Sequence, residues 1–204
     1  MKAPLLEVSD LSRRFGGLKA VEGLSLHVGK SEIVGLLGPN GSGKTTALNL
    51  ISGALKPDRG SITLDGHETA GSPNYKVARL GIARTFQLVR LFKSVTVLDN
   101  VVAGMSFTRE HRFGVTAGAA AVALLERVGL GAKAACRAEE LTYIDQKRLE
   151  LARCLASQPR VLLLDEWLAG LNPTELLQAV DLVRSLKRDG ISILMVEHVL
   201  DAVR

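Results

Sequence analysis

Features that would assign a chain to a specialised class are scarce in this sequence of 204 residues. It has two cysteines, Cys136 and Cys154, and their spacing fits neither a disulfide framework nor a metal-binding motif. We therefore expect reduced thiols, as in a cytosolic protein. The least polar stretch, Gly114–Leu125, has twelve residues, whereas a transmembrane helix needs about 20. The N-terminal segment also lacks the apolar run of a secretory signal peptide.

Charge of one sign is not concentrated anywhere in the sequence. The 26 Lys and Arg residues against 21 Asp and Glu give a net charge of +5, and the longest basic runs are adjacent pairs such as Arg13-Arg14. A solvated basic face explains this balance, and a docking surface or a nucleic-acid groove is the alternative. The length fits one large domain, or one domain with an inserted lobe.

Apolar patterns predict an α/β core formed by both ends of the chain. The middle, roughly Val89–Ser157, lacks buried-strand runs and is predicted to be a mostly helical insertion. Helices are expected over Lys44–Ser52, ended by Gly53, and over Thr174–Arg188. The second of these lies between two apolar strands, an order that implies a parallel sheet. The expected strands are Leu5–Val8, Leu24–Val28, Ser31–Leu37 (buried on both faces), Ser61–Leu64, Val161–Glu166 and Ile191–His198.

The strongest motif is a glycine-rich segment between an expected strand and an expected helix, which matches G-x-x-x-x-G-K-[ST] in full. Glycines let the backbone curl so that successive N–H groups point at phosphate oxygens, and the helix adds its dipole. Lys44 would reach the β- and γ-phosphates of ATP, and the Thr45 hydroxyl would help to hold Mg²⁺. The alternative is a glycine-rich turn with an accidental lysine. The candidate nucleotide-binding residues here are Gly38, Pro39, Asn40, Gly41, Ser42, Gly43, Lys44, Thr45 and Thr46.

A second motif, VLLLDE, delivers two carboxylates at the end of a buried strand, where ligands collect in open α/β sheets. Asp165 would bind in the Mg²⁺ shell, and Glu166 would orient and deprotonate the attacking water. By itself such a pair is also typical of an ordinary surface turn. Combined with the phosphate loop, it predicts a hydrolysis site.

Three single residues lie where nucleotide chemistry would use them. Gln87 follows the segment GIARTF and would ligate Mg²⁺ or contact water, His198 ends the last apolar strand near the γ-phosphate, and Phe15 would stack on the base. The alternatives are a surface glutamine, a structural histidine and a core phenylalanine. The segment Leu141–Gln146 opens an amphipathic helix, with Thr142 as its expected N-cap.

In their order along the chain, these parts resemble the ATP-binding-cassette (ABC) ATPases over almost the whole sequence. This resemblance implies a P-loop α/β domain with a largely parallel sheet, an N-terminal antiparallel β lobe and an inserted helical lobe. It implies one domain over 1–204, with the core and β lobe in 1–88 and 158–204 and the helical subdomain in 89–157. By the same likeness Phe15 stacks on adenine, Gln87 is the Q-loop, 169–172 is the D-loop and His198 is the switch histidine. The signature motif acting in trans would be Thr142, Tyr143, Ile144, Asp145 and Gln146.

The segments RRFGGLKAVEGLSL, GIARTFQLVRLFKSVTVLDNV and LAGLNPTE resemble the ATPase subunits of branched-chain amino-acid importers. This likeness implies ATP and Mg²⁺ as ligands, a second ABC ATPase subunit (homodimer or heterodimer) and transmembrane permease subunits. A solute-binding protein would take part indirectly, and no nucleic acid is expected. Such a subunit is peripheral, on the cytoplasmic face of the inner membrane.

The sequence departs from the family pattern at three places. Ile144 stands at a glycine position of the signature, and Asp145 adds negative charge near the γ-phosphate. These changes suggest slow hydrolysis in trans or work in an asymmetric heterodimer; the alternative is that the helix dipole alone suffices. Trp167, the only tryptophan, replaces the usual proline after the carboxylate pair, and we expect its fluorescence to respond to Mg-ATP. The chain also ends six residues after His198, which suggests a shortened C-terminal end.

The sequence is also compatible with two other functions. A nucleotide-binding regulatory subunit with low turnover would fit the altered signature, although Glu166 argues against complete inactivity. A soluble ABC protein outside transport, acting on nucleic acid or ribosomes, would fit the basic charge, although such proteins usually carry two cassettes or a coiled-coil insertion. A phosphate-loop kinase fits poorly, because no lid or acceptor site is evident.

Overall fold

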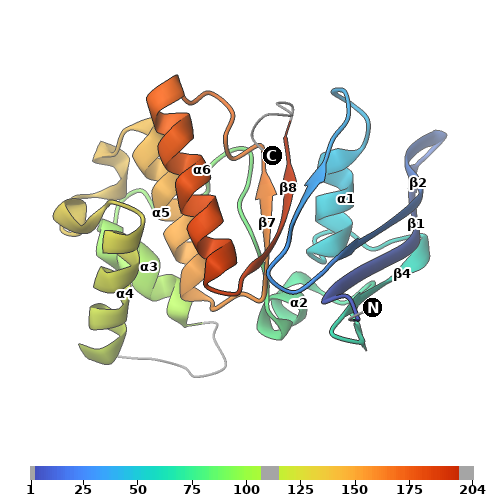
Figure 1. Ribbon diagram of the computed structural model, residues 1–204, viewed down its shortest axis with the longest axis horizontal. Helices are drawn as coiled ribbons and strands as arrows, with labels where there is room; N and C mark the ends of the chain where they lie inside the picture. The colour runs from blue at the N-terminus through green and yellow to red at the C-terminus, as the bar shows by residue number, and fades with distance from the viewer. Residues whose placement is uncertain (1–2, 107–114, 198–204) are drawn as a thin grey trace.

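Two four-stranded sheets organise the chain in a computed structural model that describes residues 3–106 and 115–197 (Figure 1). One sheet is antiparallel with the strand order β2-β1-β4-β5, and the other is parallel with the order β3-β8-β7-β6. The antiparallel strands are β1 (Leu6–Phe15), β2 (Leu18–Val28), β4 (Arg59–Leu64) and β5 (His67–Glu68). The parallel strands are β3 (Ile33–Leu36), β6 (Ile82–Arg84), β7 (Val161–Asp165) and β8 (Ser192–Val196). The predicted fold class is confirmed.

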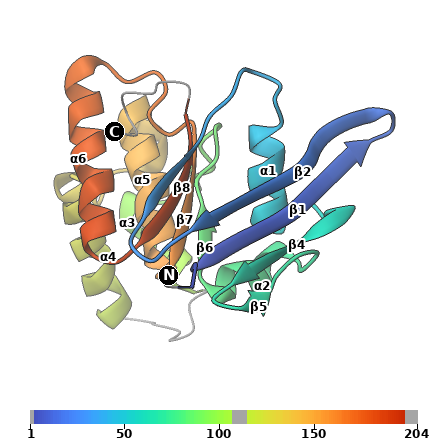
Figure 2. The same cartoon turned by 45° about the vertical axis from the view of Figure 1, so that its right-hand side comes forward.

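The described elements between β6 and β7 are all helical. The helices α3 (Val97–Met105), α4 (Val115–Arg127) and α5 (Tyr143–Ala156) pack on one another at one end of the molecule. Helix α1 (Lys44–Ile51) lies between the two sheets (Figures 1 and 2). None of the helices in the described parts of the chain is long and apolar enough for a bilayer span. Also helical are α2 (Asn74–Leu80) and α6 (Pro173–Arg188), with 3₁₀ turns η1 (Gly131–Lys133) and η2 (Ala138–Glu140).

The core has two halves, one on each face of the parallel sheet. Leu162 and Leu164 of β7 pack against the cluster of α3–α6, whereas Val161 and Leu163 pack against α1 and the antiparallel sheet. This alternation explains the uninterrupted apolar run, because a strand covered on both faces needs no polar positions. The expectation of burial on both faces is wrong for β3, which is half-buried at an edge of the described sheet.

The first two strands are longer than their apolar patterns predict. The pairing of β1 with β2 shifts register between Val8 and Leu11 and again between Leu11 and Arg13. Such irregularities break the alternation with period two on which the prediction depends. The end of β1 and the start of β2 carry exposed charged residues, including Arg14 and Lys19, so no apolar face marks these parts of the strands.

Candidate functional site

The phosphate loop connects β3 to α1, and its backbone is shaped by glycine. Gly43, the N-cap of α1, has φ +89°, and a Cβ atom there would lie 2.0 Å from the carbonyl oxygen of Ala20. No side chain caps α1, and its first turn contains no acidic residue. The N–H groups of that turn therefore remain available to an anion, which the helix dipole also favours.

Lys44 lies inside the curl of this loop. Its side chain is buried, and Nζ donates hydrogen bonds of 2.8 Å to the carbonyl oxygens of Gly38 and Pro39. Both acceptors are neutral, so they do not balance the ammonium charge. A phosphate group would supply a charged partner in the same place.

Asp165 is at the carboxyl end of β7, fully buried beside the phosphate loop. Its Oδ1 accepts a hydrogen bond of 3.4 Å from Thr45 Oγ1, and its Oδ2 accepts one of 2.7 Å from Arg84 Nη2. The fold thus brings together two of the three predicted Mg²⁺ ligands, Thr45 and Asp165, which are 120 positions apart. Hydroxyl and carboxylate oxygens next to a phosphate site are the ligands that Mg²⁺ prefers.

These oxygens fit a cation that is shared with a phosphate. Among residues 3–106 and 115–197, no cluster of three or more His, Cys, Asp or Glu side chains has the geometry of a self-sufficient metal site. Mg²⁺ commonly uses one or two protein oxygens together with substrate phosphates and water. The donor set therefore fits Mg²⁺ that arrives with a nucleotide.

Glu166 and Gln87 come together across the edge of the parallel sheet. Gln87 Nε2 donates a hydrogen bond of 2.9 Å to Glu166 Oε2. Glu166 has φ +50°, in the left-handed region that non-glycine residues rarely adopt, and its N–H donates to the carbonyl oxygen of Val196 at 3.0 Å. Strained backbone held in this way is typical of functional positions. The predicted base and the predicted Q-loop glutamine therefore belong to one constellation.

Phe15 is exposed at the turn between β1 and β2, so it is not a core residue. It pairs with Leu18, two positions before the Ala20 carbonyl that contacts Gly43, and the Arg13 guanidinium lies 5.1 Å from its ring centre. Stacking of Phe15 on the base stays a prediction. His198, the predicted switch histidine, lies outside the described residues.

The predicted signature segment forms the start of α5. Thr142 is the N-cap, as expected, and its hydroxyl accepts a hydrogen bond from the Asp145 N–H at 3.4 Å. Thr142 and Tyr143 are exposed, and Ile144 is half-buried. Gln146 turns back to the preceding loop, since its Nε2 donates to the Leu141 carbonyl oxygen at 3.0 Å.

Asp145 differs from its expected role. Its carboxylate is buried and paired with Lys133 Nζ at 2.5 Å, and Arg148 lies 3.7 Å away. The negative charge that Asp145 was expected to add near the γ-phosphate is therefore offset by these two cations. The fold neutralises this charge within the helical layer, so Ile144 is the main departure at this helix end.

Three charged residues around the site were not found from the sequence. Arg84 joins Asp165 to Asn49, whose Oδ1 accepts a hydrogen bond of 2.6 Å from Arg84 Nη1. Glu150 of α5 accepts hydrogen bonds from the N–H groups of Phe86 (3.2 Å) and Arg90 (3.0 Å) and so holds the segment that carries Gln87.

Burial raises the pKa of Glu150 above its usual range. The third residue missed is Lys147, which is buried on α5. A charged residue at a position where an amphipathic pattern calls for burial was the sequence signal that could have identified such residues.

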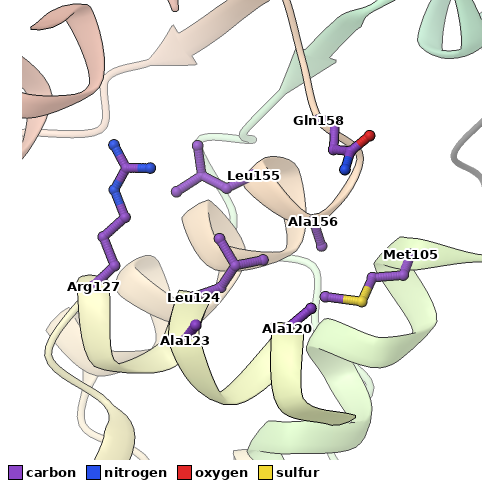
Figure 3. A pocket seen from close by; sticks show the side chains of 8 residues that line it. All are labelled: Met105, Ala120, Ala123, Leu124, Arg127, Leu155, Ala156 and Gln158. Atoms are coloured by element: carbon purple, nitrogen blue, oxygen red, sulfur yellow. The ribbon is translucent and has the colours of Figure 1, made fainter. Parts of the chain in front are cut away.

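A separate cavity of about 320 Å³ lies in the helical layer between α3, α4 and α5 (Figure 3). Apolar side chains such as Met105, Leu124 and Leu155 line most of it, and Arg127 at its margin forms an ion pair with Asp189. None of the predicted site residues lines this cavity. The candidate chemistry is therefore at the end of the parallel sheet.

Comparison with known proteins agrees with this geometry. The family model described as "ABC transporter" matches residues 21–169. The chain is 42% identical to the high-affinity branched-chain amino acid transport ATP-binding protein LivG of Salmonella typhimurium, with 97% of this chain and 83% of that protein covered. The chain is also 42% identical to BraF of Pseudomonas aeruginosa, which has the same description, with the same shares of both chains covered.

Solved structures show the same fold. The crystal structure of the ADP conformation of MJ1267, an ATP-binding cassette of an ABC transporter, has a TM-score of 0.89 and 30% identity and covers 99% of this chain and 84% of that one. The dimeric post-hydrolysis structure of the cassette MJ0796, bound to ADP and Pi, has a TM-score of 0.87 and 25% identity, with 97% and 90% covered.

Proposed function

This chain belongs to the ABC transporter family, and from that premise we propose that it is the ATP-binding and ATP-hydrolysing subunit of an importer for branched-chain or related amino acids. One observation carries the enzymatic part: the phosphate loop, Thr45–Asp165 and Gln87–Glu166 converge at the same end of the parallel sheet. The similarity to LivG and BraF supports the choice of solute.

Each residue of the convergence has a chemical task in this proposal. The loop amides and Lys44 bind the β- and γ-phosphates, and Phe15 stacks on the adenine. Mg²⁺, when bound, would neutralise charge on the phosphate oxygens, and Thr45, Asp165 and Gln87 would hold it. Glu166 takes the proton of the attacking water, and the Gln87 amide fixes the direction of that carboxylate.

A second subunit completes the site. The dimer reported for MJ0796 supports a pairing in which the exposed start of α5 of one subunit faces the γ-phosphate held by the other. Thr142, Tyr143 and Ile144 would form that contact, with the helix dipole directed at the phosphate. Closure on ATP and opening after hydrolysis would then drive permease subunits, with this chain peripheral on the cytoplasmic face and a solute-binding protein acting upstream.

Phosphate release by the purified chain tests the enzymatic part. The wild type should hydrolyse Mg-ATP, and Glu166→Gln should lower the rate by about 10²-fold or more while nucleotide still binds, because the amide cannot accept the proton. Equal rates for the two proteins would refute the assignment of Glu166. Reconstitution with its permease should give ATP-dependent uptake of leucine, isoleucine or valine, and uptake of none of them would refute the branched-chain assignment.

The half-buried Ile144 favours a second candidate, a regulatory subunit with low turnover. A β-branched residue is restricted in backbone conformation and adds bulk where the signature would approach a phosphate. This candidate predicts tight Mg-ATP binding without multiple turnovers in the assembled complex. Steady-state phosphate release by that complex separates the two functions.

A further inference from the structure

Lys147 is a buried lysine whose hydrogen bonds go to backbone carbonyls of a single loop. It lies in the second turn of α5, and its side chain is 3% exposed. Its Nζ donates to the carbonyl oxygens of Ala169 at 2.7 Å, Trp167 at 3.0 Å and Glu166 at 3.5 Å. Burying an ammonium is costly unless strong hydrogen bonds compensate, so this arrangement has to be explained.

The loop is tied to α5 in both directions. The Trp167 indole N–H donates to the Lys147 carbonyl oxygen at 3.3 Å, so each of these two residues bonds the backbone of the other. The same ammonium lies 4.9 Å from the ring centre of Tyr143, an exposed residue of the signature segment. Lys147 therefore contacts the signature helix end and the loop after β7 at once.

The loop held by Lys147 includes the proposed catalytic base. Glu166 has φ +50°, and carbonyl groups that converge on one point repel each other unless a cation lies there. Other bonds brace the same turn: Ala169 N–H donates to the Glu166 carbonyl at 3.1 Å, and Leu168 N–H donates to Glu197 Oε1 at 3.0 Å. The Lys147 ammonium is the cation on which the carbonyl groups of this turn converge.

We propose that Lys147 is a positioning residue that makes the signature helix and the Glu166 loop move as one body. This inference rests on the proposed ATPase function. When a partner's nucleotide docks on the start of α5, a displacement of that helix is passed through the ammonium to the carbonyls of 166–169. Each active site then orients its own base according to whether its signature segment is engaged.

The effect should be on turnover and not on nucleotide affinity. The hydrogen bonds of Lys147 go to the loop 166–169 and none goes to the phosphate loop. Without the ammonium, the loop relaxes and the Glu166 carboxylate loses its direction. A misplacement of about 1 Å at a reacting group can cost about 10²-fold in rate.

The test compares Lys147→Met with Lys147→Arg and with the matched control Arg148→Met. Arg148 is the next residue of α5, but it donates to Gln178 Oε1 of α6 at 2.8 Å and not to the loop. It also lies 3.7 Å from Asp145, which keeps its ion pair with Lys133 in this variant. We expect Lys147→Met to lower kcat about 10- to 100-fold with KM within about threefold. Arg should restore much of the rate because it keeps charge and donors, and Arg148→Met should stay within about twofold.

Trp167 provides a second readout that does not depend on turnover. As the only tryptophan, it reports directly on the loop. In Lys147→Met its indole should become more accessible to quenching by acrylamide, and its fluorescence should no longer respond to Mg-ATP. Lys147→Gln, a milder change that keeps an N–H donor, should give an intermediate result and serves if the methionine variant does not fold.

Unchanged kcat and quenching in the Lys147 variants would overturn the inference, as would an equal fall in Arg148→Met. Absence of phosphate release from the wild type would instead refute the proposed function. In that case the quenching of Trp167 still decides whether Lys147 holds the loop.

Discussion

Two helices of this chain begin at the proposed nucleotide sites, and their first turns are built differently. The start of α1 has Gly43 as its N-cap, no capping side chain and no acidic residue in its first turn. The start of α5 has Thr142 as its N-cap, bonded to the Asp145 N–H, and Asp145 itself is paired with Lys133. One end leaves its N–H groups open to an anion, whereas the other is already partly satisfied by its own side chains.

The difference indicates a division of labour between the two ends. Binding of the phosphates depends on α1, whose open amides and Lys44 act within one chain. In the proposed function the α5 end contributes in trans, and the half-buried Ile144 would make that contribution weaker than a glycine would. Nucleotide affinity and turnover should therefore respond to different substitutions.

The largest expected effect is that of Gly43→Ala. Its Cβ would lie 2.0 Å from the Ala20 carbonyl oxygen at φ +89°, so the loop must shift, and we expect a loss of about 2–4 kcal/mol in the free energy of unfolding together with loss of ATP binding. Gly41→Ala is the matched control, since its φ is +79° but nothing lies within 4 Å of the added Cβ. Equal losses of stability in the Gly43→Ala and Gly41→Ala variants, measured by thermal unfolding, would contradict this explanation.

The next effect concerns Ile144→Gly, which restores a small residue at the α5 end. We expect steady-state phosphate release by the assembled complex to rise about three- to tenfold, because the backbone can approach the partner's γ-phosphate more closely. Affinity for ATP of the isolated chain should stay the same. An unchanged rate in the assembled complex would mean that the helix dipole alone suffices.

A smaller effect is expected for the α5 cap. Thr142→Ala removes the hydroxyl that accepts from the Asp145 N–H, and loss of such a cap costs about 1 kcal/mol. Urea denaturation followed by circular dichroism measures it, with Thr142→Ser as the control that keeps the acceptor. If serine is as destabilising as alanine, then the cap contributes nothing.

The smallest effect is a pH dependence on the inner face of α5. Burial raises the pKa of Glu150 above its usual 4.5 in the folded chain. The wild type therefore has its full stability below that pH and loses part of it as the pH rises through the higher folded-state value. In Glu150→Gln this loss disappears, so the melting temperature of the variant relative to wild type should increase from pH 4 to 7. A decrease over that range would contradict the direction of the shift.

Local patterns predicted the parts of the site that lie close together in the sequence. The phosphate loop, the carboxylates at the end of β7 and the Thr142 cap could be located because each is set by a short run of residue types in a strand or helix context. The fold class followed from the same patterns together with the family resemblance.

The contacts between distant segments could not be found in this way. Arg84–Asp165, Glu150 with the N–H groups of Phe86 and Arg90, and Lys147 with its loop carbonyls join residues 19 to 81 positions apart. No periodicity marks such pairs, because their stability comes from burial that only the assembled fold creates. For the same reason the sequence placed the charge on Asp145 near the γ-phosphate, whereas the fold pairs it with Lys133.

Titration of Mg-ATP into the Glu166→Gln chain by calorimetry tests the central claim most directly, because turnover is strongly slowed and the chain can be kept dilute and monomeric. We expect one ATP to bind per chain. Lys44→Ala should abolish this binding, because the ammonium contributes a charge-assisted bond to phosphate in cis. Thr142→Ala should leave the affinity for ATP within about twofold, because the α5 cap contributes no such bond. Binding that survives Lys44→Ala, or that needs Thr142 as much as Lys44, would contradict the central claim.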